Sequence, residues 1–274
     1  MNHEPTPSSL SARAILAQRL TKPPANRLTI QTDLRHFGLI TYALPASRLA
    51  PHIPTDRFAI AQFEIDGRPM ALLSAVPFWD ADFHYLRLAP FLKFQFGQTN
   101  HRVYVIDKRT GQHAVWFLGT TLGSPLVYGP RWLWRMPWHL ARYQVNCRYD
   151  PAQGRYQRYD YRVESDWGAA EISLRDTGQP AAEVPGFATQ DDWQLILTHP
   201  LDGFYYRLDG GLGSYSVWHE LIPLTVGQPQ QLYFSLYERL NLLSPTEMQQ
   251  PHSVFLCPQT RFEVYLPPRR LVRG

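Results

Sequence analysis

The feature that most constrains this chain is a series of short segments in which polar and apolar residues alternate, separated by turn-forming residues. Alternation with a period of two is typical of a half-buried β-strand, because successive side chains point to opposite faces. The clearest hairpin places strands over residues 58–65 and 70–76 around Asp66-Gly67, a pair that favours a tight turn. From residue 27 onward the pattern predicts a mainly β (α+β) fold, a sandwich or a barrel with a few added helices.

Other segments extend this prediction. Further strands are expected over residues 99–106 and 113–122, and as a meander over residues 142–149, 156–164 and 169–174. Helices are expected over residues 44–54 and 231–243 and after Thr189, which can cap residues 191–197. Helical spacing over residues 131–142 is interrupted by Pro137, which breaks or begins a helix.

The first 26 residues differ from the rest. Prolines bracket a short candidate helix that Ser8 or Ser9 could cap, and its apolar positions are few. We therefore predict a mobile N-terminal tail over residues 1–26, followed by a single domain over residues 27–274.

Composition narrows the class of protein. With 44% hydrophobic and 18% charged residues, the chain is globular. Its arginines are spread along the sequence and interleaved with acids, whereas nucleic-acid binders cluster positive charge, so no nucleic-acid partner is expected. The longest uncharged apolar run, near residues 71–79, is about half of the roughly 18 residues that suggest a membrane span. Two distant cysteines and an N-terminus without a secretion signal predict a cytoplasmic protein.

Familiar catalytic and cofactor motifs fail on their spacing. His219-Glu220 is followed by Leu221-Ile222-Pro223, so the helical zinc motif HExxH is absent. The glycine-rich segment 209–214 lacks the third glycine of a dinucleotide loop, the lysine of a phosphate loop and the serine of a nucleophile elbow. We therefore predict neither a metal nor a cofactor.

The strand that begins at Asn100 is the strongest candidate for a binding surface. Alternation places Asn100, Arg102 and Tyr104 on one face and a mostly apolar set on the other. The polar face can point to solvent, or it can line a barrel interior, where a buried arginine must find partners. Alternation by itself leaves both arrangements open.

The segment Phe96-x-x-x-Asn100-x-Arg102-x-Tyr104-Val105, followed by a turn and Val115-Trp116-Phe117-Leu118, resembles the YqjF-like proteins, a family of uncharacterised function. His36-Phe37 and the helix that follows it fit the same pattern, and the resemblance covers about residues 27–270. It implies the fold of acetoacetate decarboxylase, a single cone-like antiparallel β-barrel with a central cavity and a few peripheral helices. The Asn100, Arg102 and Tyr104 face is then expected to point inward.

The resemblance also indicates what is missing. The segment from Gly129 to His139 looks like the decarboxylase element that carries a lysine pair, but Trp138-His139 stand in its place. Neither residue can form the imine that a buried lysine of lowered pKa forms in that enzyme. Gln98 stands where a glutamate is expected in YqjF-like relatives, and Lys93 is the one lysine that could reach a cavity.

Two functional classes follow. The first is a protein that binds a small, partly apolar molecule bearing a carboxylate or carbonyl group. The second is a lyase or isomerase without a Schiff base, in which His139 or His36 supplies acid–base chemistry, although a lone histidine in apolar surroundings is more often a core residue. The sequence leaves a homo-oligomer open. The residues expected to contact the ligand are Gln98, Asn100, Arg102, Tyr104, Arg131 and Trp138.

Overall fold

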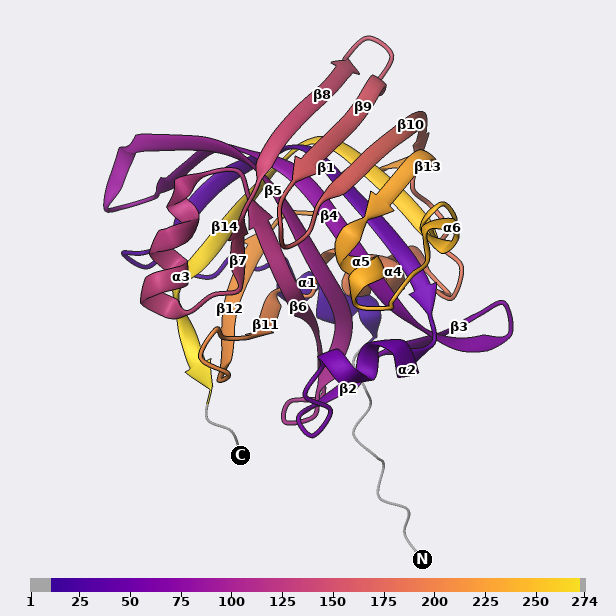
Figure 1. The fold of residues 1–274 in the computed structure, drawn as a ribbon, viewed down its shortest axis with the longest axis horizontal. Coiled ribbons are helices and arrows are strands. Elements are labelled where there is room, and N and C mark those ends of the chain that lie inside the picture. The colour runs from indigo at the N-terminus through magenta and orange to yellow at the C-terminus, as the bar shows by residue number, and fades with distance from the viewer. Residues whose placement is uncertain (1–10, 272–274) are drawn as a thin grey trace, which may run out of the picture.

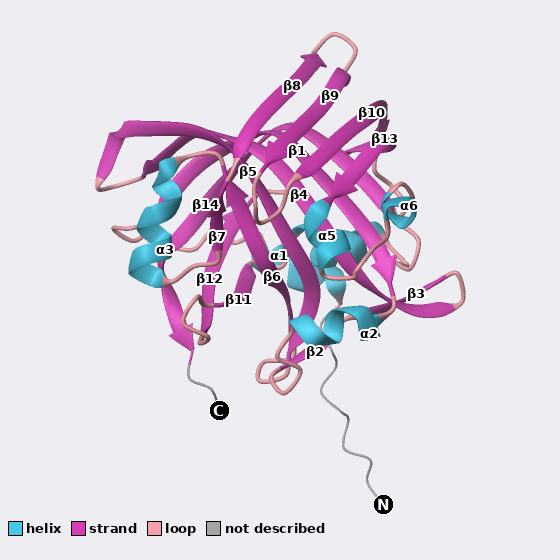
Figure 2. Ribbon diagram, in the orientation of Figure 1, coloured by secondary structure: helices cyan, strands magenta, loops and turns pink. Residues whose placement is uncertain are grey.

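The computed structural model describes residues 11–271, and most of them lie in strands (Figures 1 and 2). Seven strands pair in the order β1-β4-β5-β6-β11-β12-β14, and β14 pairs again with β1, so the strands close into a ring. Their bounds are Ile30–Leu44, Arg68–Tyr85, Ala89–Asp107, Gln112–Leu122, Asp202–Tyr206, Leu212–His219 and Ser253–Leu271. The predicted mainly β fold is confirmed, with one difference: β6 and β11 run parallel, so the ring is not wholly antiparallel.

Four further strands extend the sheet beyond β14, in the order β13-β10-β9-β8 (Figure 1). Their bounds are Thr225–Phe234, Ala170–Pro180, Arg155–Glu164 and Arg142–Asp150. The meander predicted from alternation is therefore present, and its inward side chains, such as Tyr159 and Tyr161, pack in one cluster with Tyr42 and Val103 of the ring. Three short strands lie off this path: β2 (Phe58–Ile60), β3 (Gln62–Ile65) and β7 (Trp138–Leu140).

Alternation along β4 and β5 separates two hydrophobic clusters. The even-numbered residues Leu72, Val76 and Tyr104 belong to the cluster inside the ring. The odd-numbered residues Leu73 and Val103 belong to the cluster between the ring and the extension. These strands are buried on both faces. Because successive side chains point to opposite faces, alternate residues of one strand pack in different clusters.

Turn chemistry accounts for the first hairpin. Asp66 and Gly67 both have left-handed backbones, with φ of 51° and 70°, between β3 and β4. Two successive positive φ values match the right-handed twist of the flanking strands, and glycine adopts them without steric cost. The predicted hairpin is therefore confirmed, and β4 and β5 extend well past their predicted ends.

Two predicted helices need correction. The helix α3 occupies Tyr128–Trp134 and ends at Arg135 in a left-handed conformation, and β7 then follows Pro137. Residues 131–142 are therefore not one helix, because Pro137 cannot continue it. Residues 231–243 begin as the end of β13, and only Ser235–Arg239 form a helix, α5.

The other short helices include those predicted. Thr189 caps α4 (Gln190–Trp193) with a reciprocal capping box, and a π-helical turn, η3 (Gln194–Thr198), continues it. The remaining helices are α2 (Ala46–Leu49), η1 (Ala50–His52), η2 (Pro125–Val127) and α6 (Pro245–Met248).

The N-terminal segment contributes a helix that packs on the ring. The predicted caps Ser8 and Ser9 lie outside the described residues, and α1 (Ala12–Arg19) instead begins after Ser11, whose side chain accepts a hydrogen bond from the Ala14 amide. Leu16 is buried in the inner cluster, and Arg19 donates hydrogen bonds to the carbonyls of His113 and His199. The boundary at residue 27 and the mobility of the tail stay predictions.

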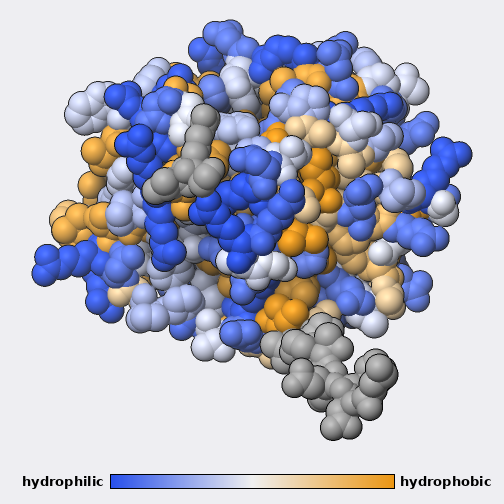
Figure 3. Space-filling model, turned by 90° about the horizontal axis from the view of Figure 1, so that it is seen from below, coloured by the Kyte–Doolittle hydropathy of each residue, from blue (hydrophilic) through white to orange (hydrophobic). Residues whose placement is uncertain are grey.

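The face of the molecule shown in Figure 3 is mostly hydrophilic, with apolar side chains exposed among the polar ones. The most exposed large apolar side chains are Phe91, in the hairpin of β4 and β5, and Trp132, on α3. No helix in the range 11–271 is long and apolar enough to cross a membrane.

Candidate ligand-binding cavity

A cavity of about 100 Å³ lies inside the ring. Its walls come from β1, β4, β5, β6, β12 and β14, with Trp138 of β7 and the segment after η3 contributing at its sides. Apolar side chains form most of the lining, including Val76, Phe78, Phe117, Met136, Trp138 and Phe262. The polar lining residues are Thr32, Asp80, Gln98, Asn100, Arg102, Thr198 and Tyr215. A largely apolar chamber with a few polar groups is the usual form of a small-molecule site.

Arg102 is the cation of this cavity. Its Nη2 donates to the Leu197 carbonyl at 2.7 Å, and its guanidinium carbon lies 5.6 Å from the centre of the Tyr104 ring. Its Nε is buried and has no hydrogen-bond partner. No acidic side chain of the described residues lies within 4 Å of it, unlike Arg57, another partly buried arginine, which pairs with Asp107. The guanidinium therefore has hydrogen-bonding capacity that the protein does not use.

Two amide side chains lie beside Arg102 on β5. Gln98 donates from Nε2 to Asn100 Oδ1 at 3.0 Å, and Thr120 donates to the same oxygen at 2.8 Å. Because the Asn100 oxygen accepts both bonds, its amide NH₂ group remains to donate elsewhere. The strand predicted to carry a polar face therefore does point Gln98, Asn100 and Arg102 into the cavity.

Tyr104 is on the same face but does not line the cavity. Its ring is 1% exposed, and its hydroxyl lies 2.8 Å from Ser74 Oγ and donates weakly to the Leu197 carbonyl at 3.4 Å. Ser74 in turn lies 2.8 Å from Thr41 Oγ1. Tyr104 is thus held in an internal hydrogen-bond chain one row beyond Arg102, and it shares the Leu197 carbonyl with that residue. The prediction that it contacts the ligand is not supported by its position.

Asp80 is the acidic cavity residue that the sequence reasoning missed. It is 2% exposed, its Oδ1 accepts a 2.9 Å hydrogen bond from Thr32, and its Oδ2 has no partner. Burial raises the pKa of this carboxyl to about 7, and the Thr32 hydrogen bond opposes that rise. A signal was present in the sequence, because Asp80 has the same parity as Val76 and Phe78 at the end of the apolar run 71–79.

The segment 137–139 places only one of its two candidate residues in the cavity. Trp138 lines it, whereas the His139 ring stacks on Trp167 with their centres 4.1 Å apart. Burial and the nearby Arg131 lower the pKa of His139 to about 4. The two neighbours separate because β7 is a strand that pairs with β6, and adjacent side chains of a strand point to opposite faces. Pro137 therefore does not begin a helix, which was the other outcome that the sequence left open.

Arg131 and His36 lie outside the cavity lining as well. Arg131 donates to the Trp138 carbonyl at 2.7 Å, so it fixes the backbone beside a lining residue. His36 sits at an irregularity of β1 with φ of 51°, and its Nδ1 lies 3.2 Å from the Tyr156 hydroxyl. The next residue, Phe37, is the one that reaches the cavity.

All three lysines lie within the described residues, and none lines the cavity. Lys93 pairs with Asp82 at 2.6 Å and is half exposed, Lys22 pairs with Glu263 at 2.5 Å, and Lys108 donates to the Thr55 carbonyl. The interpretation that Lys93 could reach the cavity is therefore wrong. Over residues 11–271 no group of three or more His, Cys, Asp or Glu side chains is placed to hold a metal ion.

Residues 31–261 match the model of the family DUF2071, described as an uncharacterized conserved protein. No curated protein sequence matches the chain. Acetoacetate decarboxylase from Legionella pneumophila has a similar structure, with 13% identity, a TM-score of 0.58 and coverage of 97% of this chain and 98% of that one.

Two further solved structures are similar. An acetoacetate decarboxylase-like enzyme from Sphingomonas wittichii has 10% identity and a TM-score of 0.57, with coverage of 90% of this chain and 94% of that one. The enduracididine biosynthesis enzyme MppR, complexed with pyruvate, has 13% identity and a TM-score of 0.54, with coverage of 92% and 91%. At these identities the likeness shows a shared fold, which is the fold that the resemblance implied.

Proposed function

The chain belongs to the DUF2071 family, and we propose that it binds a small, partly apolar organic acid inside the ring of strands, with Arg102 contacting the acid group. The structurally similar MppR was solved with pyruvate, an oxo acid of the same chemical class. The amides of Gln98 and Asn100 would orient the ligand, and Trp138 and its apolar neighbours would enclose its hydrocarbon part.

One observation carries this proposal: Arg102 is a partly buried cation that faces a cavity and has no acidic partner. Burying a charge without a counter-charge is costly, so proteins rarely leave one in that state unless a ligand completes it. A guanidinium also matches the planar geometry of a carboxylate, which it can bind through two parallel hydrogen bonds.

The size of the cavity supports a compact ligand. An apolar cavity of roughly 150 Å³ holds a molecule of benzene's size, so a cavity of about 100 Å³ suits a ligand no larger than benzene, with roughly six non-hydrogen atoms or fewer. Histidine acid–base catalysis, the alternative function, loses its support here, because neither His36 nor His139 lines the cavity.

The first prediction is that the protein does not form an imine with an oxo acid. No lysine amine reaches the cavity, and an imine requires an amine nucleophile. Incubation with acetoacetate or pyruvate followed by borohydride should leave the intact mass unchanged. A stable adduct that maps to Lys93 or another lysine would contradict this prediction.

The second prediction tests the binding proposal directly. Pyruvate, acetoacetate, propionate and butyrate would be titrated into the wild-type protein and into Arg102→Ala, with NMR shift changes as the readout. Affinity should fall by about ten- to a hundredfold in Arg102→Ala, since a hydrogen bond between charged groups contributes roughly 1.5–3 kcal/mol. Arg102→Lys should not restore it fully, because an ammonium cannot reproduce the planar contact.

Arg158→Ala provides the matched control. Arg158 is an exposed arginine of β9 that pairs with Asp160, so its loss removes the same charge without touching the cavity. Both variants should keep the wild-type fold in a circular-dichroism spectrum. If Arg102→Ala bound every acid as tightly as wild type, or if no acid bound to wild type, the proposal would be wrong.

A further inference from the structure

We infer that Asp80 presents an uncharged carboxyl group to the cavity, and that its O–H donates a hydrogen bond to a neutral carbonyl or hydroxyl oxygen of a molecule bound in its part of the cavity. This inference deepens the proposed function and rests on it, because it assigns a second polar contact in the same cavity. A neutral oxygen is a chemical feature that Arg102 does not require.

The placement of Asp80 is the first part of the argument. Its side chain points inward, like the other even-numbered residues of this part of β4. The neighbouring strand β1 contributes Thr32, whose hydroxyl donates a hydrogen bond to Asp80 Oδ1. The same threonine hydroxyl lies 3.3 Å from the Ala81 carbonyl, so it can donate to only one of these two oxygens at a time. Oδ2 is buried without any partner and belongs to a residue that lines the cavity.

The chemistry around Asp80 favours the protonated form. No lysine, arginine or histidine of the described residues lies within 4 Å of this carboxyl. Burial without a counter-charge raises its pKa to about 7. A neutral buried carboxyl carries one O–H donor, and a donor without a partner is costly unless a ligand accepts from it.

The ionisable groups on the strands around Asp80 are consistent with a protonated Asp80 carboxyl. Tyr143 of β8 and Tyr161 of β9 lie near enough for the Asp80 charge to raise their pKa values, and both stay neutral. Charged side chains of β1, β4, β5 and β14 form ion pairs of their own: Asp33 with Arg261, Asp82 with Lys93, and Glu263 with Lys22.

Asp80 and Arg102 lie in different parts of the cavity. Asp80 is opposite Phe96 and Ser74 is opposite Arg102, so the two residues are separated by six positions along the paired strands. Six residues of a strand span roughly 20 Å between Cα atoms. The two functional groups are closer than this if the side chains point toward each other. Consistent with this separation, the Arg102 charge does not contribute to the pKa shift of Asp80. The cavity is thus polar at two sites, one for an anion and one for a neutral oxygen.

The experiment uses a neutral probe, so that only the protein can titrate. Binding of 2-butanone would be measured by NMR at about pH 5.5 and about pH 8.5, on either side of the Asp80 pKa of about 7. Its isostere 2-methyl-1-butene, with a methylene in place of the carbonyl oxygen, is the matched control. Affinity for the ketone should fall by at least about tenfold at the higher pH, because the ionised carboxylate cannot donate. The alkene should bind equally at both.

Two variants assign the effect to Asp80. Asp80→Asn keeps a donor that does not titrate, so it should bind the ketone at both pH values. Asp82→Asn, at a half-buried neighbour that pairs with Lys93, should behave as wild type. The buried histidines His199 and His219, which contact the lining residues Thr198 and Phe262, have pKa values lowered by burial to about 3 and about 4, so they keep one charge state in this range.

The outcomes separate this inference from the proposed function. If carboxylate probes bind through Arg102 but ketone affinity does not change with pH, or changes equally in Asp80→Asn, the inference is wrong and the proposed function stands. If the ketone behaves as expected but Arg102→Ala binds acids normally, the role of Arg102 fails instead. If the ketone binds at neither pH, Asp80 offers no such contact and the inference is again wrong.

Discussion

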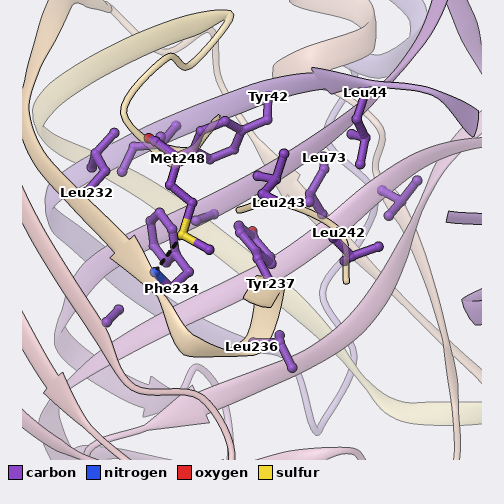
Figure 4. Packing of buried hydrophobic residues seen from close by; sticks show 14 of the residues in the cluster. Tyr42, Leu44, Leu73, Leu232, Phe234, Leu236, Tyr237, Leu242, Leu243 and Met248 are labelled. Atoms are coloured by element: carbon purple, nitrogen blue, oxygen red, sulfur yellow. Dashed lines mark hydrogen bonds between the residues drawn. The ribbon is translucent and has the colours of Figure 1, made fainter. Parts of the chain in front are cut away.

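Tyr237→Ala is expected to lower the free energy of unfolding by about 3–5 kcal/mol, the usual range for removing a large buried aromatic side chain. Tyr237 is fully buried, and its ring lies edge-on to that of Tyr42, with the ring centres 6.1 Å apart (Figure 4). It also lies edge-on to the ring of His101, with the centres 5.2 Å apart. It sits in the cluster between the ring and the extension, where Phe234 and Leu242 also pack. Denaturant unfolding would measure the loss as a lower midpoint with an unchanged slope.

Two matched variants divide this effect. Tyr237→Phe keeps the ring but removes the hydroxyl that lies 3.1 Å from His101 Nδ1. Because the other His101 nitrogen already has no partner, this variant should lose about 1–3 kcal/mol. Tyr128→Ala, at an exposed tyrosine of α3, should change stability by less than about 0.5 kcal/mol. A loss below about 1 kcal/mol for Tyr237→Ala would mean that this cluster is not part of the cooperative core.

Asp80→Asn is expected to change the pH dependence of stability. The folded protein holds the Asp80 pKa at about 7, and an unfolded aspartate has a pKa of about 3.9. Between these values the folded state binds more protons than the unfolded state, so wild-type stability falls as pH rises through this window. A shift of about three units corresponds to roughly 4 kcal/mol, which is the order of magnitude of the loss.

The variant should remove this pH-dependent loss. Relative to wild type, Asp80→Asn should gain roughly 3–4 kcal/mol of unfolding free energy between about pH 4 and about pH 8, measured by denaturant unfolding at several pH values. Asp82→Asn should show no such gain, because the ion pair with Lys93 lowers the pKa of Asp82. A difference between Asp80→Asn and wild type that stays constant with pH would show that Asp80 is ionised, or hydrated, in the folded protein.

Local sequence determined several elements of this protein. The dipeptide Asp66-Gly67 determined a hairpin, since its backbone preference requires no distant partner. Thr189 determined the start of α4 for the same reason. Alternation placed Gln98, Asn100 and Arg102 on one face of a strand, because the period of two belongs to the strand itself. Alternation did not determine whether that face pointed to solvent or to the interior.

Tertiary structure decided what the inward face meets. The ring closes only because β14, near the end of the chain, pairs with β1, near its start, and that closure turns the polar face of β5 into a cavity wall. The same pairing of distant strands brings Thr32 to Asp80 and buries a carboxyl that the sequence places just after an apolar run. Burial of this kind depends on neighbours from other strands, which local alternation does not specify.

The segment 137–139 shows that the register of one short strand selects which side chain lines the cavity. Its sequence placed either Trp138 or His139 in the cavity, and the pairing of β7 with β6 chose Trp138. A shift of one residue in that pairing would exchange the two side chains and put an imidazole beside the ligand. The sequence by itself therefore determined the strands, their turns and which residues share a face. Strand pairing across the closed ring decided which of those faces became the site, because register is set by contacts between segments far apart in the chain.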